Sequence, residues 1–209
     1  MVTNSCCEEI AYNEINQDKN CCEQFKHYLQ SNNEYWINQD CLNSVDSSFN
    51  DQKETTACLV AGKLEASENR VNFKIESDNY KNYCRVHLDD NTIRKIDEIG
   101  LIKTPKSVKN FKKCDYLFVR CGIKCCFIFV EIKTQSDINK AIDQIKETVI
   151  CFSEIIKDVK CKRAYIVVSK KVPNVDTLLQ SERIDFRREY RFPLEIINSD
   201  ETINDNNFK

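Results

Sequence analysis

Three charged residues, Asp115, Glu131 and Lys133, stand at one end of a segment that the sequence predicts to be a β-hairpin with strands over 114–120 and 125–133. Folding this hairpin about its midpoint places Asp115 opposite Glu131. The period of two along a strand puts Glu131 and Lys133 on the same face. The spacing therefore predicts that two carboxylates and one ammonium group converge at one end of an otherwise apolar hairpin.

These residue types favour chemistry at a divalent cation. Carboxylates are hard oxygen ligands suited to Mg²⁺ or Mn²⁺. We expect the cation to be held by Asp115, Glu131 and the backbone carbonyl of Ile132. Lys133 would orient or deprotonate the attacking water and stabilise developing negative charge. Metal-assisted phosphodiester cleavage requires such a set of groups.

Length and composition set the broad class of the protein. The chain has 209 residues, of which 41% are hydrophobic and 31% charged, as in an ordinary globular domain. No apolar run approaches the ~20 residues needed to span a bilayer, and the N-terminus lacks the features of a signal peptide. We therefore expect a cytoplasmic protein with no membrane partner. The net charge of −2 implies that any nucleic-acid contact comes from local patches.

The chain divides into three parts by composition. Residues 1–56 are polar and are expected to form a helical or partly disordered N-terminal extension. Residues 57–197 carry the strand and helix signals of one α/β domain. Residues 198–209 are expected to be a disordered tail.

Within the central part, strand patterns precede a long helix and a further strand. Alternation predicts strands over 70–75 and 83–88 before the hairpin. An amphipathic stripe predicts a helix over 137–157, and an apolar run predicts a buried strand over 164–169. Residues 176–180 are expected to form a short helix. A helix between strands suggests a crossover connection in a mixed sheet, and hence an α/β fold.

The order of these features resembles the PD-(D/E)xK nuclease superfamily over residues ~70–170. Asp115 begins the hairpin, Glu131-Ile132-Lys133 ends it, and Gln144 lies in the following helix, where a glutamine is frequent in several branches. The resemblance implies a restriction-endonuclease-like mixed β-sheet core of αβββαβ type flanked by helices. It also implies one or two divalent cations and hydrolysis of nucleic-acid phosphodiester bonds, in restriction, defence or repair.

The resemblance also suggests partners and further site residues. It does not fix the substrate; we favour DNA over RNA, and a homodimer is a further expectation because many double-strand cutters of this fold act as dimers. Gln144 would hydrogen-bond the lysine, the water or a phosphate, or else it is a polar helix residue facing solvent. The superfamily often adds a glutamate from a preceding helix, for which Glu98, Glu54 and Glu23 are weak candidates.

Two basic clusters could hold a phosphate backbone. One directly precedes Asp115, and the other is interleaved with aromatic residues near the C-terminus. The alternative is a solvated loop and a surface strand. The expected substrate contacts are Lys109, Lys112, Lys113, Arg187 and Arg188.

Two other classes of protein remain open. The same fold could serve as a catalytically silent binding or scaffolding module. Alternatively, the 13 cysteines could supply a small zinc module using Cys114, Cys121, Cys125 and Cys126. We expect most cysteines to be reduced thiols used as small apolar residues, and a disulfide framework is the least favoured reading.

Overall fold

The computed structural model describes residues 21, 22, 25, 26, 45, 46, 59–88, 112–122, 125–134, 138–169 and 177–208. The described strands are β1 (Val45–Asp46), β2 (Leu59–Ala61), β3 (Glu65–Glu68), β4 (Val71–Glu76), β5 (Tyr83–His87), β6 (Tyr116–Arg120), β7 (Cys126–Lys133), β8 (Cys161–Val168), β9 (Leu194–Asn198) and β10 (Thr202–Asn204). The described helices are α4 (Ile138–Cys151), α5 (Ser153–Ile156), α6 (Thr177–Tyr190) and the 3₁₀ turns η2 (Tyr80–Asn82) and η4 (Asp205–Asn207).

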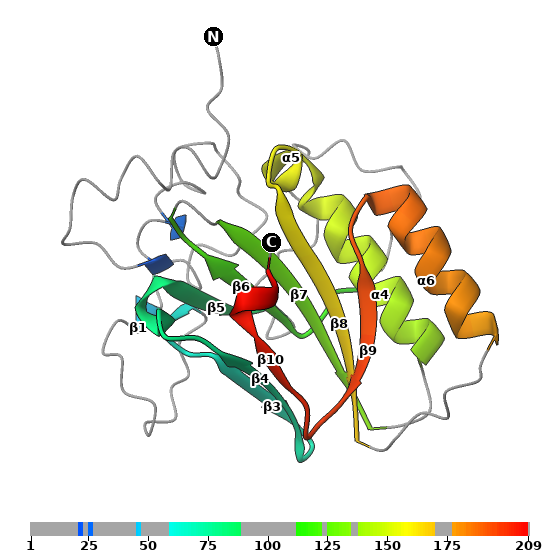
Figure 1. The fold of residues 1–209 in the computed structure, drawn as a ribbon, viewed down its shortest axis with the longest axis horizontal. Helices are drawn as coiled ribbons and strands as arrows, with labels where there is room; N and C mark the ends of the chain where they lie inside the picture. The colour runs from blue at the N-terminus through cyan, green and yellow to red at the C-terminus, as the bar shows by residue number, and fades with distance from the viewer. Residues whose placement is uncertain are drawn as a thin grey trace, which may run out of the picture.

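The strands form two mixed sheets, and the protein is an α/β fold (Figure 1). The larger sheet has the order β1-β2-β5-β6-β7-β8-β9, and the smaller has the order β10-β4-β3. In the larger sheet β5, β6 and β7 are antiparallel, while β8 and β9 add in parallel. Parallel neighbours need a crossover connection. Helices α4 and α6 lie within the two crossovers, so the expected crossover is confirmed.

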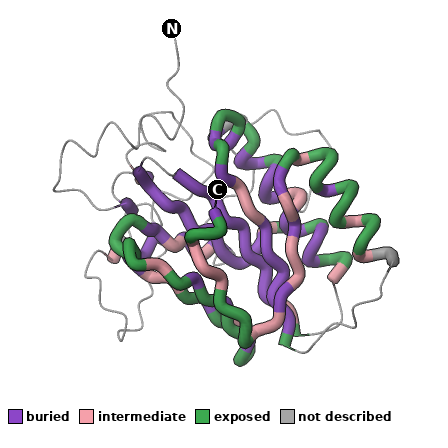
Figure 2. The backbone as a smooth tube through the Cα atoms, in the orientation of Figure 1, coloured by how far each residue is buried: buried purple, intermediate pink, exposed green. Residues whose placement is uncertain are grey.

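Strand β7 shows how the larger sheet separates two cores. Its alternate residues Cys126, Ile128, Val130 and Ile132 pack with the smaller sheet. Phe127 and Phe129 point to the other face and pack with α4. Because both faces are covered, most of the strand is buried (Figure 2). Glu131 and Lys133 share the parity of Phe127, so they lie on the helix face.

Two helices differ in extent from their sequence-based expectations. The helix predicted over 137–157 is interrupted at Phe152, which divides it into α4 and α5. The helix expected at 176–180 continues to Tyr190 as α6. Phe186 is fully buried on α6, with Leu179 and Tyr190 packed on the same core at helical spacing. Burial of that face explains why the basic and aromatic stretch is helical.

The expectation of reduced thiols is wrong for most of the described cysteines. Disulfides join Cys21 to Cys121, Cys22 to Cys84, and Cys126 to Cys161, and Cys125 is also disulfide-bonded. The free thiols among the described cysteines are Cys114 and Cys151, both buried. Disulfides are rare in a reducing cytoplasm, which weighs against the expected cytoplasmic location.

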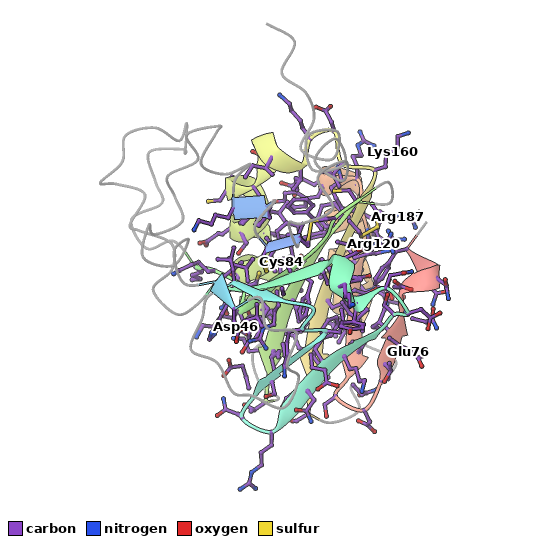
Figure 3. All side chains as sticks on the ribbon, turned by 90° about the vertical axis from the view of Figure 1, so that its left-hand side faces the viewer. Asp46, Glu76, Cys84, Arg120, Lys160 and Arg187 are labelled. Atoms are coloured by element: carbon purple, nitrogen blue, oxygen red, sulfur yellow. A yellow bond between two sulfur atoms is a disulfide. The ribbon has the colours of Figure 1, made fainter. Side chains whose placement is uncertain are left out.

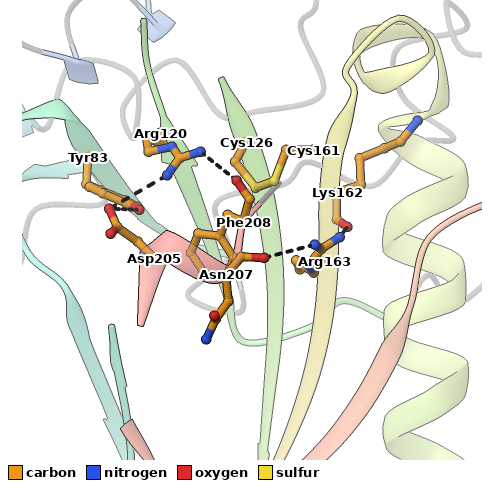
Figure 4. The surroundings of a disulfide bond; sticks show 9 residues. All are labelled: Tyr83, Arg120, Cys126, Cys161, Lys162, Arg163, Asp205, Asn207 and Phe208. Atoms are coloured by element: carbon orange, nitrogen blue, oxygen red, sulfur yellow. Dashed lines mark hydrogen bonds and ion pairs between the residues drawn. A yellow bond between two sulfur atoms is a disulfide. The ribbon is translucent and has the colours of Figure 1, made fainter. Parts of the chain in front are cut away.

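Residues 198–208 are also ordered rather than the disordered tail expected from composition. They form the end of β9, then β10 and η4, and Phe208 is buried. The Asp205 carboxylate accepts hydrogen bonds from Ser77 Oγ at 2.5 Å and Tyr83 Oη at 3.2 Å. It also pairs with buried Arg120 at 3.6 Å. Figure 4 shows Asp205 with Tyr83 and Arg120 beside the Cys126–Cys161 disulfide. Partners distant in sequence therefore hold the C-terminal segment on the sheet.

Candidate active site

The hairpin has the register predicted from its sequence. Strands β6 and β7 pair from Tyr116 opposite Val130 to Arg120 opposite Cys126. The turn begins at Gly122, whose φ of 95° is in the region that glycine adopts without steric cost. The same register places Asp115 opposite Glu131, so the predicted juxtaposition of these two carboxylates is confirmed.

Direct contacts join the two acids and the lysine. The backbone N–H of Asp115 donates to Glu131 Oε2 at 3.1 Å. The backbone N–H of Ile132 donates to Asp115 Oδ2 at 2.6 Å. The Lys133 ammonium forms an ion pair with Glu131 Oε1. Asp115 is 7% exposed and Glu131 is 0% exposed, so the pair is withdrawn from water.

The two carboxylates of this cluster, Asp115 and Glu131, lie close enough to repel each other when both are ionised. Burial and, after it, the neighbouring Asp115 carboxylate raise the pKa of Glu131 to about 8, against the opposing effect of the Lys133 ammonium, which lowers it. Two carboxylates face one ammonium group, which leaves an excess of negative charge when both acids are ionised. A cation bound here would relieve that excess.

Helix α4 holds the segment that leads into Asp115. Glu147 Oε2 accepts a hydrogen bond from the Lys112 backbone N–H at 2.6 Å. Gln144 Nε2 donates to the Lys113 carbonyl at 2.7 Å. Thr148 Oγ1 accepts from the Cys114 backbone N–H at 2.8 Å. These side chains lie on one face of the helix at i, i+3 and i+4, so three successive residues of the segment are fastened to α4.

Sequence reasoning singled out Gln144 but missed Glu147 and Thr148. Gln144 is buried, which excludes the solvent-facing alternative, and its Oε1 has no hydrogen-bond partner among the described residues. Glu147 and Thr148 share its helix face, and this spacing is the one signal that could have identified them. Their partners are backbone groups more than 30 residues away, which no local pattern reveals.

The first group of predicted substrate contacts lies beside the acidic pair. Lys112 and Lys113 immediately precede the Cys114-Asp115 dipeptide, and Lys112 is exposed. The Lys112 ammonium is 3.9 Å from the Asp143 carboxylate on α4. The predicted contact Lys109 lies outside the described residues.

Arg187 and Arg188 lie in the last turn of α6, away from the acidic pair. The chain enters β9 shortly after this turn, and Leu194 pairs with Ala164 on β8. This is toward the end of the sheet where β7 and β8 begin, whereas Glu131 and Lys133 lie where β7 ends (Figure 1). Figure 3 places Arg187 in the same upper half of the molecule as Lys160, which precedes β8. Arg188 also pairs with Asp185 at 2.8 Å. The structure does not bring the two basic groups together.

The donor set fits a hard divalent cation with few protein ligands. No group of three or more His, Cys, Asp or Glu side chains able to hold a metal occurs within the described residues. Mg²⁺ commonly binds through one or two carboxylates and keeps several waters, and the Asp115–Glu131 pair matches this habit. The glutamates considered as additional ligands, at 23, 54 and 98, lie outside the described residues.

The proposed zinc module is not supported by the sulfur chemistry. Cys121, Cys125 and Cys126 are all in disulfides, and a disulfide sulfur has no thiolate with which to bind zinc. The remaining thiol, Cys114, is buried, and burial raises its pKa well above the ordinary range. A four-cysteine site using these residues is therefore excluded in this structure.

Comparison with known proteins adds no assignment: no family model, curated protein or solved structure matches the chain. Of the helices in the described parts of the chain, none has the length and apolar character to cross a membrane.

Proposed function

We propose that the chain is a divalent-metal-dependent nuclease of the PD-(D/E)xK type that hydrolyses phosphodiester bonds of nucleic acid. The observation that carries the proposal is the buried pair of Asp115 and Glu131, with Lys133 in contact on the same face of β7. The order β5, β6, β7, α4, β8 also supports it, because this is the βββαβ part of the core that the resemblance implies.

Each residue of the cluster has a role that its position allows. Asp115 and Glu131 would hold Mg²⁺ or Mn²⁺, with the Ile132 carbonyl as a further oxygen ligand. The cation supplies Lewis acidity toward a phosphate oxygen and makes water more acidic. Lys133 is half-buried beside the carboxylates, where its ammonium would stabilise negative charge that develops on the phosphate.

The substrate would approach from the side of Lys112 and Lys113. An exposed lysine next to the acidic pair can neutralise a phosphate that flanks the scissile bond. We propose DNA rather than RNA as the substrate, and a homodimer as the form that cuts a duplex. We assign the contacts beside the acidic pair to Lys112 and Lys113 rather than to Arg187 and Arg188, because the two arginines lie near the start of β9.

The test is cleavage of labelled DNA and RNA, single and double stranded, with Mg²⁺ or Mn²⁺. Glu131→Gln and Lys133→Met should each lower the cleavage rate by about 100-fold or more. Lys112→Ala should weaken substrate binding, whereas Arg188→Ala removes the same charge at the far end and serves as the matched control. Cleavage that survives both Glu131→Gln and Lys133→Met would refute the proposal. A wild type that neither cuts nor binds Mn²⁺ would favour the catalytically silent module.

A further inference from the structure

The antiparallel ladder between β6 and β7 ends beside the acidic pair. In such a ladder every second opposed pair exchanges both backbone hydrogen bonds. The Asp115 carbonyl accepts from the Leu88 N–H at 2.8 Å and therefore faces β5, while the Asp115 N–H donates to the Glu131 side chain. The next pair whose backbone groups should meet between β6 and β7 is therefore Cys114 with Ile132.

Neither expected donor of that pair is used in the ladder. The Cys114 N–H donates to Thr148 Oγ1 at 2.8 Å. The Ile132 N–H donates to Asp115 Oδ2 at 2.6 Å. Ile132 lies within β7, and the N–H and C=O of a regular strand residue point to the same side, so its carbonyl should also face β6. In a continued ladder the Cys114 N–H would donate to the Ile132 carbonyl, but here that N–H donates to Thr148.

The hydroxyl of Thr148 makes two hydrogen bonds, one as donor and one as acceptor. Thr148 is fully buried, and its single hydroxyl proton is donated to the Gln144 carbonyl at 2.7 Å. Only the oxygen lone pairs remain, and one of them accepts from the Cys114 N–H. Thr148 thus offers a fixed acceptor on α4 to the Cys114 N–H.

We propose that Thr148 is a positioning residue for the metal site. By taking the Cys114 N–H, it keeps the Ile132 carbonyl open as a third oxygen ligand beside Asp115 and Glu131. Backbone carbonyls are suitable ligands for hard divalent cations. The inference rests on the proposed function, because it assumes that the carboxylate pair binds such a cation.

The experiment measures Mn²⁺ affinity by calorimetry on the full chain with its disulfides intact. Thr148→Val keeps the size of the side chain but cannot accept a hydrogen bond, and it should weaken Mn²⁺ binding about 10- to 100-fold, as for other groups that orient metal ligands. Thr148→Ser restores the hydroxyl and should recover the wild-type affinity. Ile145→Val is the matched control, since it trims a buried side chain of α4 without removing a hydrogen bond.

The outcomes separate this inference from the proposed function. If the wild type fails to bind Mn²⁺, the proposed function fails and the inference fails with it. If the wild type binds and a folded Thr148→Val binds equally well, the inference alone is overturned. Circular dichroism reports folding. If Thr148→Val does not fold, Thr148→Cys takes its place, because a thiol is a weak acceptor of similar size; wild-type affinity in that variant would also overturn the inference.

Discussion

The raised pKa of Glu131 makes a quantitative prediction about stability that does not depend on any bound metal. In the folded protein this pKa is about 8, against an ordinary value of 4.5. Between these two values the folded protein keeps a proton that the unfolded chain releases. The free energy of unfolding should therefore fall as pH rises from about 4.5 to about 8. Glu131→Gln keeps the shape of the side chain and cannot titrate, so it should lack this component.

The magnitude follows from the difference between the two pKa values. Each pKa unit corresponds to about 1.4 kcal/mol, so the full effect is about 5 kcal/mol. Integrated between pH 5.5 and 8.5, the expected loss of stability is about 3 kcal/mol. The physical cause is that ionised Glu131 is buried next to a second carboxylate.

The assay is urea unfolding of wild type and Glu131→Gln, without divalent cations, at pH 5.5, 7.0 and 8.5 and constant ionic strength. Groups that do not interact with Glu131 titrate alike in both proteins and cancel in the comparison. Glu131→Gln should gain stability relative to wild type as pH rises, by about 3 kcal/mol over this range. A constant difference between the two proteins across the range would refute the argument that burial and Asp115 hold the proton on Glu131.

Three further predictions test the site and its frame. Because the pKa of Glu131 is about 8, Mn²⁺ binding should displace its proton and release about 0.9 proton at pH 7 but about 0.1 at pH 9. Calorimetry in buffers of different ionisation enthalpy measures this release, and equal release at both pH values would contradict the prediction. Replacing Cys22 and Cys84 by alanine opens a link across 62 residues and should cost about 4 kcal/mol in denaturant unfolding; a cost near zero would show that the link does not stabilise the fold. Asp205→Asn removes the carboxylate that lies 3.6 Å from the buried Arg120 guanidinium and should cost about 3–5 kcal/mol, whereas exposed Asp200→Asn should cost little. Equal melting temperatures for these two variants would refute the pairing argument.

The elements that sequence reasoning identified correctly are those whose signals are local. The alternation along β4 and the apolar stripe of α4 repeat within a few residues, so their periods indicate a strand and a helix directly. The register of the β6–β7 hairpin also follows from local facts, namely a short turn and the alternation of faces. Since Asp115 and Glu131 are members of that hairpin, their convergence could be predicted from the sequence.

Contacts between distant parts of the chain decided everything else. The link between Cys21 and Cys121 spans 100 residues, and Phe208 reaches its buried place through contacts with a strand 88 residues earlier. Neither has a periodic signal, because each depends on which surfaces the complete fold brings together. The same holds for the contact of Thr148 with Cys114 and for the burial that raises the pKa of Glu131. The members of the acidic cluster can therefore be found from local sequence patterns, whereas their protonation, their backbone partners and the frame that holds them depend on contacts formed in the complete fold.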